Sequence, residues 1–166
     1  YEFYRHWHHS TIFSLLDVVD FTDDYAALAK RIFPPVSAAQ ARTSIALLKK
    51  LKLIARDARG AWKPVARTLD AGSYVKNALI TQYQLQCLEL SKRAMLLDHR
   101  AARNFSTITL SVSRKGHELI EQKLQQFKAE VRAIAHREKE PADSVYQLNI
   151  QYFPQSLPQP RRGGKP

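Results

Sequence analysis

The densest group of side chains suited to chemistry lies between Ser37 and Pro64, where the chain reads SAAQARTSIALLKKLKLIARDARGAWKP. Eight Lys or Arg residues stand between Arg42 and Arg67, with Asp57 as the single acid among them. The chain before Arg42 holds three basic and five acidic side chains, so this positive charge is local. A local positive field beside a helix that fits a DNA groove indicates recognition of nucleic acid.

Two kinds of DNA contact can be assigned within this stretch. Glutamine and arginine have the hydrogen-bonding geometry for the edges of adenine and guanine. Lys and Arg also neutralise phosphates and thereby position a protein on the duplex. The apolar spacing after Ser37 predicts a helix that begins there. We expect base contacts from four side chains in the first half of this helix, Gln40, Arg42, Thr43 and Ser44, and phosphate contacts from Lys49, Lys50, Arg56, Arg59 and Lys63.

Protein docking is the alternative use of the same helix. Ala39, Ala46 and Leu47 lie on the face that would enter the groove, and they make that face unusually apolar. This favours a winged helix that no longer binds DNA and serves as a docking or dimerisation module. Such a module would convey a signal to a DNA-binding region elsewhere in the protein. The residues alone leave both functions open.

Three histidines near the start of the chain, His6, His8 and His9, invite a metal hypothesis, because residues three apart share one face of a helix. Zinc needs further ligands, and no paired cysteine or H-x-x-x-H pattern lies nearby. His8 shares a stripe with apolar residues, so we expect it to pack inside with one ring nitrogen hydrogen-bonded. We therefore predict no bound metal.

Catalytic signatures are missing from the sequence. It contains no G-x-x-x-x-G-K-[ST], no G-x-G-x-x-G, no H-E-x-x-H and no G-x-S-x-G. Five glycines leave little for a phosphate-binding loop, and Cys87 lies on an apolar helical stripe, where a nucleophile is poorly placed. We therefore predict that the chain is not an enzyme and needs no cofactor.

The elements that must position the basic residues follow from the spacing of apolar side chains. Residues 6–20 and 24–33 have the periodicity of helices, and the proline pair that follows ends the second one. Ser37 caps a third helix. Residues 53–56 and 61–63 are predicted strands joined by a tight turn at a glycine. Three helices followed by a basic hairpin is the order of a winged helix-turn-helix.

The second half of the chain has a different pattern. Residues 72–97 and 115–138 predict two long amphipathic helices. Residues 106–112 alternate strictly between apolar and polar side chains, and residues 145–153 alternate again through Tyr146, Leu148, Ile150 and Tyr152, as half-buried strands do. Two strands cannot make an independent sheet in water, so they must pair with the hairpin or with a second subunit.

The predicted fold class is therefore α+β and mainly helical. A winged helix-turn-helix occupies residues 1–68, and a long helix with a βαβ-like strand-helix-strand unit occupies 69–154. The tail, residues 155–166, has almost no core-type side chains, and we expect it to be flexible. The apolar stripe of the helix at 115–138 has 4-3-4-3 spacing, which suits either a seam between subunits or a cover for the strands.

Charge, hydropathy and cysteine content limit the setting. A net charge of +11 favours polyanionic partners such as duplex DNA. An anionic membrane surface is the other polyanion that this charge favours. No apolar run reaches the ~20 residues that span a bilayer, which excludes an integral membrane protein, and we expect no membrane partner. The single cysteine permits no internal disulfide, which fits a reducing cytoplasm. The chain opens at Tyr1 with one methionine in all, and we expect a longer protein with a further N-terminal region.

Three segments resemble an uncharacterised bacterial family: YEFYRHWHHSTIFSLLDVVDF, LKLIARDARGAWKP and VYQLNIQYFP, which together span most of residues 1–153. Members of that family carry this unit as a C-terminal domain of unknown function behind a predicted helix-turn-helix region. The middle segment is also similar to the wing of bacterial winged-helix regulators. The resemblance implies a regulator-like setting and no reaction. We expect a DNA-linked transcriptional regulator domain, and the alternative is a protein-interaction or dimerisation module that binds a second copy of the chain or a partner protein.

Overall fold

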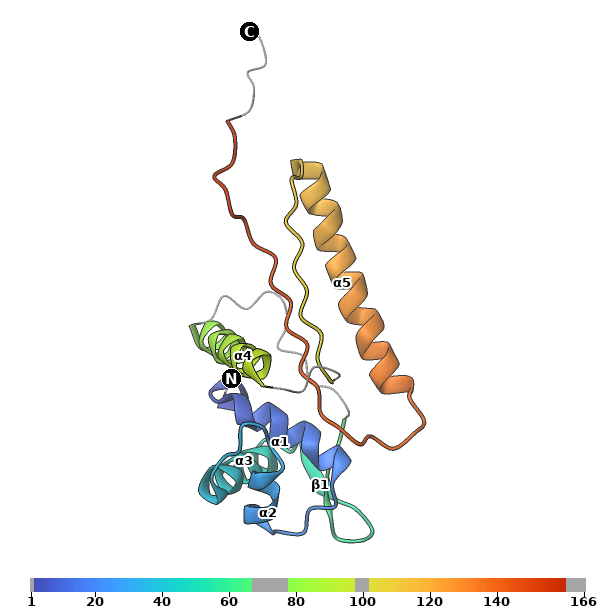
Figure 1. Cartoon of the computed structure of the whole chain (residues 1–166). Coiled ribbons are helices and arrows are strands. Elements are labelled where there is room, and N and C mark those ends of the chain that lie inside the picture. The colour runs from blue at the N-terminus through green and yellow to red at the C-terminus, as the bar shows by residue number, and fades with distance from the viewer. Residues whose placement is uncertain (1, 67–77, 98–101, 161–166) are drawn as a thin grey trace.

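The computed structural model of the chain describes residues 2–66, 78–97 and 102–160, and these are mainly helical with one small sheet. In chain order the elements are η1 (Glu2–Tyr4), α1 (Trp7–Val18), α2 (Tyr25–Lys30), α3 (Ala38–Lys50), β1 (Ile54–Arg56), β2 (Trp62–Pro64), α4 (Ala78–Leu96) and α5 (Arg114–Arg137) (Figure 1). The α+β class predicted from the sequence is confirmed at this level. We call the part from η1 to β2 the N-terminal unit.

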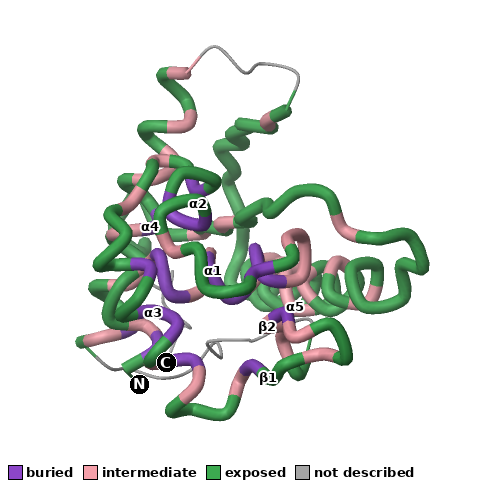
Figure 2. The backbone as a smooth tube through the Cα atoms, turned by 90° about the horizontal axis from the view of Figure 1, so that it is seen from below, coloured by how far each residue is buried: buried purple, intermediate pink, exposed green. Residues whose placement is uncertain are grey.

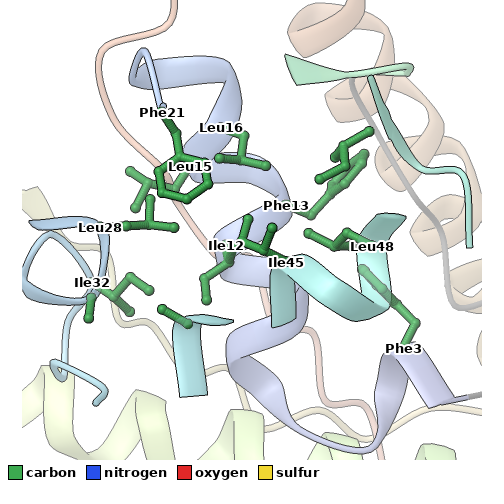
Figure 3. Packing of buried hydrophobic residues seen from close by; sticks show 13 residues of the cluster. Phe3, Ile12, Phe13, Leu15, Leu16, Phe21, Leu28, Ile32, Ile45 and Leu48 are labelled. Atoms are coloured by element: carbon green, nitrogen blue, oxygen red, sulfur yellow. The ribbon is translucent and has the colours of Figure 1, made fainter. Parts of the chain in front are cut away.

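Helices α1, α2 and α3 pack around one apolar core (Figure 3). Ile12 and Leu16 of α1 meet Ile45 and Leu48 of α3, and all four side chains are fully buried. Their three- and four-residue spacing places them on one face of each helix. Leu28 joins them from α2. Burial of each such side chain stabilises the fold by about 1.5–3 kcal/mol.

Polar caps begin α2 and α3 where the sequence places them. The Ser37 hydroxyl accepts a hydrogen bond from the Gln40 N–H at 3.1 Å, and the Gln40 side chain accepts one from the Ser37 N–H at 2.8 Å. This capping box satisfies two backbone donors that the first turn of α3 cannot satisfy itself. Asp24 caps α2 by accepting from the Ala27 N–H at 3.0 Å. Helix α2 ends at Lys30, so the helix predicted over residues 24–33 is too long at its C-terminal end.

Strands β1 and β2 form an antiparallel hairpin with Ala55 opposite Lys63. Phe21, in the loop between α1 and α2, pairs with the outer edge of β2. Gly60 lies in the turn with φ +81°, a conformation that glycine adopts without strain. Phe21 forms an isolated bridge with Trp62, in which the backbone N–H of Trp62 donates to the Phe21 carbonyl at 3.0 Å. The sequence did not reveal this third partner, and the bridge brings the α1–α2 loop beside the hairpin.

Helix α4 is attached to the start of α1 by polar contacts. The Gln86 side chain accepts from the Trp7 N–H at 2.9 Å and donates to the Arg5 carbonyl at 3.1 Å. The Tyr83 hydroxyl lies 2.8 Å from that of Ser10, and burial raises the pKa of Tyr83 to about 12, so this hydroxyl keeps its proton. The predicted helix is confirmed over residues 78–96, while 72–77 lie outside the described residues.

Residues 105–153, which we call the arm, are organised more loosely. Helix α5 is capped by Ser113, close to the predicted start. Residues 106–112 and 145–153 run in the same direction beside α5 as extended chain (Figure 1), but no strand is assigned to either segment. The prediction of strands there is wrong for the single chain. A strand is defined by backbone pairing, and among the described residues neither segment has a backbone partner.

Burial follows the same division of the chain. Buried residues gather in the N-terminal unit and in α4, whereas α5 and the extended segments are exposed or intermediate (Figure 2). Helix α5 has no buried residue, although its apolar stripe is regular. Residues 155–160, the described part of the predicted tail, are exposed and lie in no helix or strand.

Replacing Gln86 with alanine should lower the free energy of unfolding by about 1–2 kcal/mol, because an N–H and a carbonyl at the start of α1 lose their shared partner. Urea unfolding followed by circular dichroism measures this. Gln84→Ala is the matched control, since Gln84 is exposed on the same helix. Equal losses in the two variants would contradict the proposed attachment of α4.

Candidate functional site

The side chains expected to read bases are held by contacts within the chain. The Gln40 side chain is part of the α3 cap. The Thr43 hydroxyl donates to the Ala39 carbonyl at 3.0 Å, and the Arg42 guanidinium lies 4.3 Å from the centre of the Tyr25 ring. All three are exposed residues of α3, with Gln40 and Thr43 on one side of the helix and Arg42 turned toward Tyr25.

Ser44 is a correction to the predicted base-reading set. It is 0% exposed and lies in the core, because the helical spacing that exposes Thr43 turns the next residue toward α1. Its hydroxyl lies 2.9 Å from Nδ1 of His8 and 2.7 Å from Nδ1 of His9. The hydroxyl therefore cannot reach a base edge, and its role is structural.

The basic side chains of the hairpin are paired with acids from the α1–α2 loop. Nη2 of Arg56 lies 2.9 Å from Oδ2 of Asp23, and Nζ of Lys63 lies 2.9 Å from Oδ1 of Asp20. Arg59 is more distant, at 3.9 Å from Oδ2 of Asp20. The bridge between the loop and the hairpin makes these pairs possible. Three of the five predicted phosphate contacts thus face a carboxylate.

The two lysines at the end of α3 also have partners. Nζ of Lys50 lies 3.1 Å from Oε2 of Glu2. Nζ of Lys49 lies 4.2 Å from the centre of the Trp62 ring, a cation–π distance. Each of the five predicted phosphate-binding side chains therefore has an intramolecular partner. Four of the five pair with carboxylates, and the three acids concerned, Glu2, Asp20 and Asp23, all lie in the first 23 residues of the chain.

The pKa values of the paired acids are lowered, as expected for carboxylates beside basic side chains. The hydrogen bond and charge of Lys63, with a further contribution from Arg59, hold the pKa of Asp20 below its ordinary value. Arg56 lowers the pKa of Asp23, chiefly through its hydrogen bond. Sequence reasoning missed these acids because they lie more than 30 positions before their partners. The acidic run VVDFTDD was the available signal, but only the Phe21 bridge places it beside the hairpin.

Ser44 joins two buried imidazoles in one polar cluster. Its hydroxyl has one proton, and the Gln40 carbonyl lies 3.0 Å away as an acceptor for it. With that proton committed, the hydroxyl accepts from both Nδ1–H groups of His8 and His9. Burial lowers the pKa of each histidine to about 4, so both rings are neutral at pH 7. The prediction that His8 packs inside with one nitrogen hydrogen-bonded is confirmed.

The remaining metal-ligating and nucleophilic side chains lie apart from one another in the described part of the chain. No group of three His, Cys, Asp or Glu side chains there is arranged to hold a metal ion. Burial raises the pKa of the Cys87 thiol, and its Sγ accepts a hydrogen bond from Nε2 of Gln147 at 2.8 Å. A protonated, buried thiol is a poor nucleophile.

A shallow hollow of about 160 Å³ lies beside α2. Small-molecule sites are larger, typically about 300–1,000 Å³, and combine apolar walls with converging polar groups. The hollow is lined by Val19, Asp20, Phe21, Thr22, Asp24, Ala27, Leu28 and Arg31. Among the described helices, none is long and apolar enough to cross a membrane.

The chain belongs to the family described as Domain of unknown function (DUF4423), whose model matches residues 1–154. The resemblance to an uncharacterised family is thereby confirmed. No curated protein and no solved structure matches the chain. Because the family match runs through both the N-terminal unit and the arm, these two parts form one family domain.

Replacing Ser44 with alanine should lower the free energy of unfolding by about 1–3 kcal/mol, because two buried imidazole N–H groups lose their acceptor. The neighbouring variant Thr43→Ala, at an exposed position, should change it by less than about 0.5 kcal/mol. Chemical denaturation of both variants makes the comparison. A stable Ser44→Ala protein would show that the cluster contributes nothing.

Stability should fall on acidification from pH 6.5 to about 4. His8 and His9 have a pKa of about 4 in the folded chain and 6.5 otherwise, so the unfolded chain binds more protons in this window. Each pH unit then costs up to about 1.4 kcal/mol per histidine. Asp20 and Asp23, whose pKa values are lowered, contribute only at still lower pH.

Denaturation across this pH series measures the slope. His9→Gln should flatten it, whereas His136→Gln, at an exposed position on α5, should leave it unchanged. A slope that His9→Gln does not alter would contradict the assignment to the buried cluster.

Proposed function

We propose that this domain is a protein-interaction module of a bacterial regulator, built on a winged helix whose basic surface does not serve to bind DNA. One observation carries the proposal: the arm exposes large apolar side chains on extended backbone that has no partner in the described chain. The ion pairs of the basic side chains also support the proposal, because they leave these side chains less available to DNA phosphates.

The order of elements supports the winged-helix interpretation. Helix α1, the extended residue Phe21, helices α2 and α3 and the hairpin follow one another as in that motif, and Phe21 pairs with β2 at the sheet edge. Helix α3 takes the place of the recognition helix, with the hairpin as the wing. This motif positions side chains for DNA, but it does not by itself define a function.

Charge balance argues against DNA contact by this surface. Residues 2–66 hold ten basic and six acidic side chains, so the field over the N-terminal unit is much weaker than the local sequence suggests. Exposed ion pairs contribute little energy, about 0–1 kcal/mol, and phosphate could displace them. Displacement would leave Asp20, Asp23 and Glu2 beside the phosphates, which is unfavourable because like charges repel.

The arm has the composition of an interaction surface. Ile108 is 79% exposed and Tyr146 74%, values that are unusual for side chains in alternating apolar patterns. Further exposed apolar side chains on the arm are Phe105, Leu110, Val112, Leu119, Phe127, Ile134, Val145, Leu148, Ile150 and Phe153. Contiguous exposed apolar surface beyond a few hundred Å² marks a binding surface or an aggregation hazard.

Duplex DNA binding by α3 and the hairpin is the second candidate function. It is favoured by the exposed side of α3, where Arg42 and Thr43 lie in the position of base-reading residues. If this candidate is right, DNA phosphates replace Asp20 and Asp23 as the ionic partners of Arg56 and Lys63. The two candidates predict opposite outcomes for one binding measurement.

The chain should bind a labelled duplex weakly, and its residual affinity should not depend on the basic surface. We expect a quadruple alanine variant to have the same affinity and the same salt dependence as the original chain. The residues replaced in this variant are Lys50, Arg56, Arg59 and Lys63. A true phosphate contact would account for about 0.9 of the logarithmic salt slope. Fluorescence anisotropy over a salt series supplies both quantities.

A charge-matched control removes four other exposed basic side chains, Lys30, Arg31, Lys92 and Lys139. Thermal unfolding of each variant verifies that it is folded. Binding that falls steeply with salt and is lost only in the first variant would overturn the proposal and establish DNA contact. In that case Arg42→Ala should cost about 1–3 kcal/mol on a preferred site.

A further inference from the structure

We propose that the surface presented by the arm is completed by a second copy of this chain, so that two arms pack together as a homodimer. This inference rests on the proposed function and names its partner. It follows from four features of the arm: its unpaired backbone, its attachment to α4, the width of the apolar face of α5, and the area that remains exposed.

The backbone groups of the extended segments face solvent, because no described residue pairs with them. Residues 106–112 and 145–153 have neither a backbone partner in each other nor one in β1 and β2. Both segments end near the start of α5, where Nδ1 of His117 lies 3.2 Å from the Tyr152 hydroxyl. They therefore run in the same direction (Figure 1). A two-fold axis perpendicular to the segments turns the partner's segments antiparallel to them, and antiparallel strands can pair directly.

Helix α4 holds one face of the second segment and leaves the other face open. Nδ2 of Asn149 donates to Oγ of Ser91 at 2.6 Å, and Gln147 contacts Cys87. Because side chains alternate along an extended chain, Tyr146 and Leu148 point the opposite way, and they are 74% and 56% exposed. The segment is thus held in place by its polar side, with its apolar side available.

Helix α5 has a wider apolar face than the segments cover. Ile120, Leu124 and Val131 are partly buried. Leu119, Phe127 and Ile134 lie on the adjoining strip of the helix, separated by eight and seven residues, and are 47–69% exposed. One half of the face packs within the chain and the other half remains for a partner.

The exposed area matches what a dimer requires. Twelve large apolar side chains of the arm, each 36–79% exposed, offer on the order of 1,000 Å². A standard protein interface buries about 800 Å² per partner. A second copy brings the same open edges and the same apolar face, so one symmetric contact satisfies both chains at once. Other partners would have to supply an unrelated matching surface.

The test is sedimentation velocity of the 166-residue chain over a concentration series. We expect a dimer that dissociates on dilution, and at least about a tenfold rise in Kd for the variant Ile108→Ser/Leu148→Ser. Both substituted side chains are exposed in the single chain, so folding should be preserved. The matched control is Val65→Ser/Leu85→Ser, which removes two apolar side chains outside the arm that are 59% and 52% exposed.

Amide hydrogen exchange locates the contact. Amides of residues 106–112 and 145–153 should be protected in the dimer and exchange freely in the Ile108→Ser/Leu148→Ser variant. A monomer at every concentration, a dimer that this variant does not weaken, or a dimer whose arm amides stay unprotected would overturn the inference. The proposed function is judged separately, because the anisotropy measurement reports DNA contact whatever the oligomeric state.

Discussion

Packing of α1 against α3 positions every other part of the N-terminal unit. Ile12 and Leu16 meet Ile45 and Leu48, and Ser44 beside them receives two imidazoles from α1. The α1–α2 loop leaves the end of α1 and the hairpin leaves the end of α3, so this contact brings the two together. The start of α1 also receives α4. Core packing and one buried polar cluster therefore determine where charge and apolar surface appear.

The basic stretch illustrates how charge that is local in sequence becomes balanced in space. Its side chains point toward a surface, as the pattern predicts, but acids from the chain's first 23 residues meet them there. The Phe21–Trp62 bridge is the cause, because it aligns the acidic loop with the hairpin. A cationic composition thus coexists with a surface that, over the described N-terminal unit, offers few unpaired cations to a phosphate backbone.

The arm raises a different physical problem. Its helix and extended segments have the periodicities of a covered sheet, yet the described chain supplies no backbone partner for either segment. Side-chain contacts with α4 hold the second segment in place without burying its apolar side. The family match extends over the whole arm, so the arm belongs to the domain. Packing of the arm against another protein chain best explains this pattern and this exposure. The proposed interaction module and the proposed homodimer rest on that same explanation.

Local physical chemistry was sufficient for the elements that the sequence predicted. The Ser37 cap, the turn at Gly60 and the apolar spacing of α1, α3, α4 and α5 act over a few residues, so they can be recognised without the fold. Ser44 became buried, Asp20 came to lie beside Lys63, and residues 106–112 and 145–153 remained unpaired. These outcomes depend on contacts between distant parts of the chain, which periodicity and composition do not encode, and only the tertiary structure decided them.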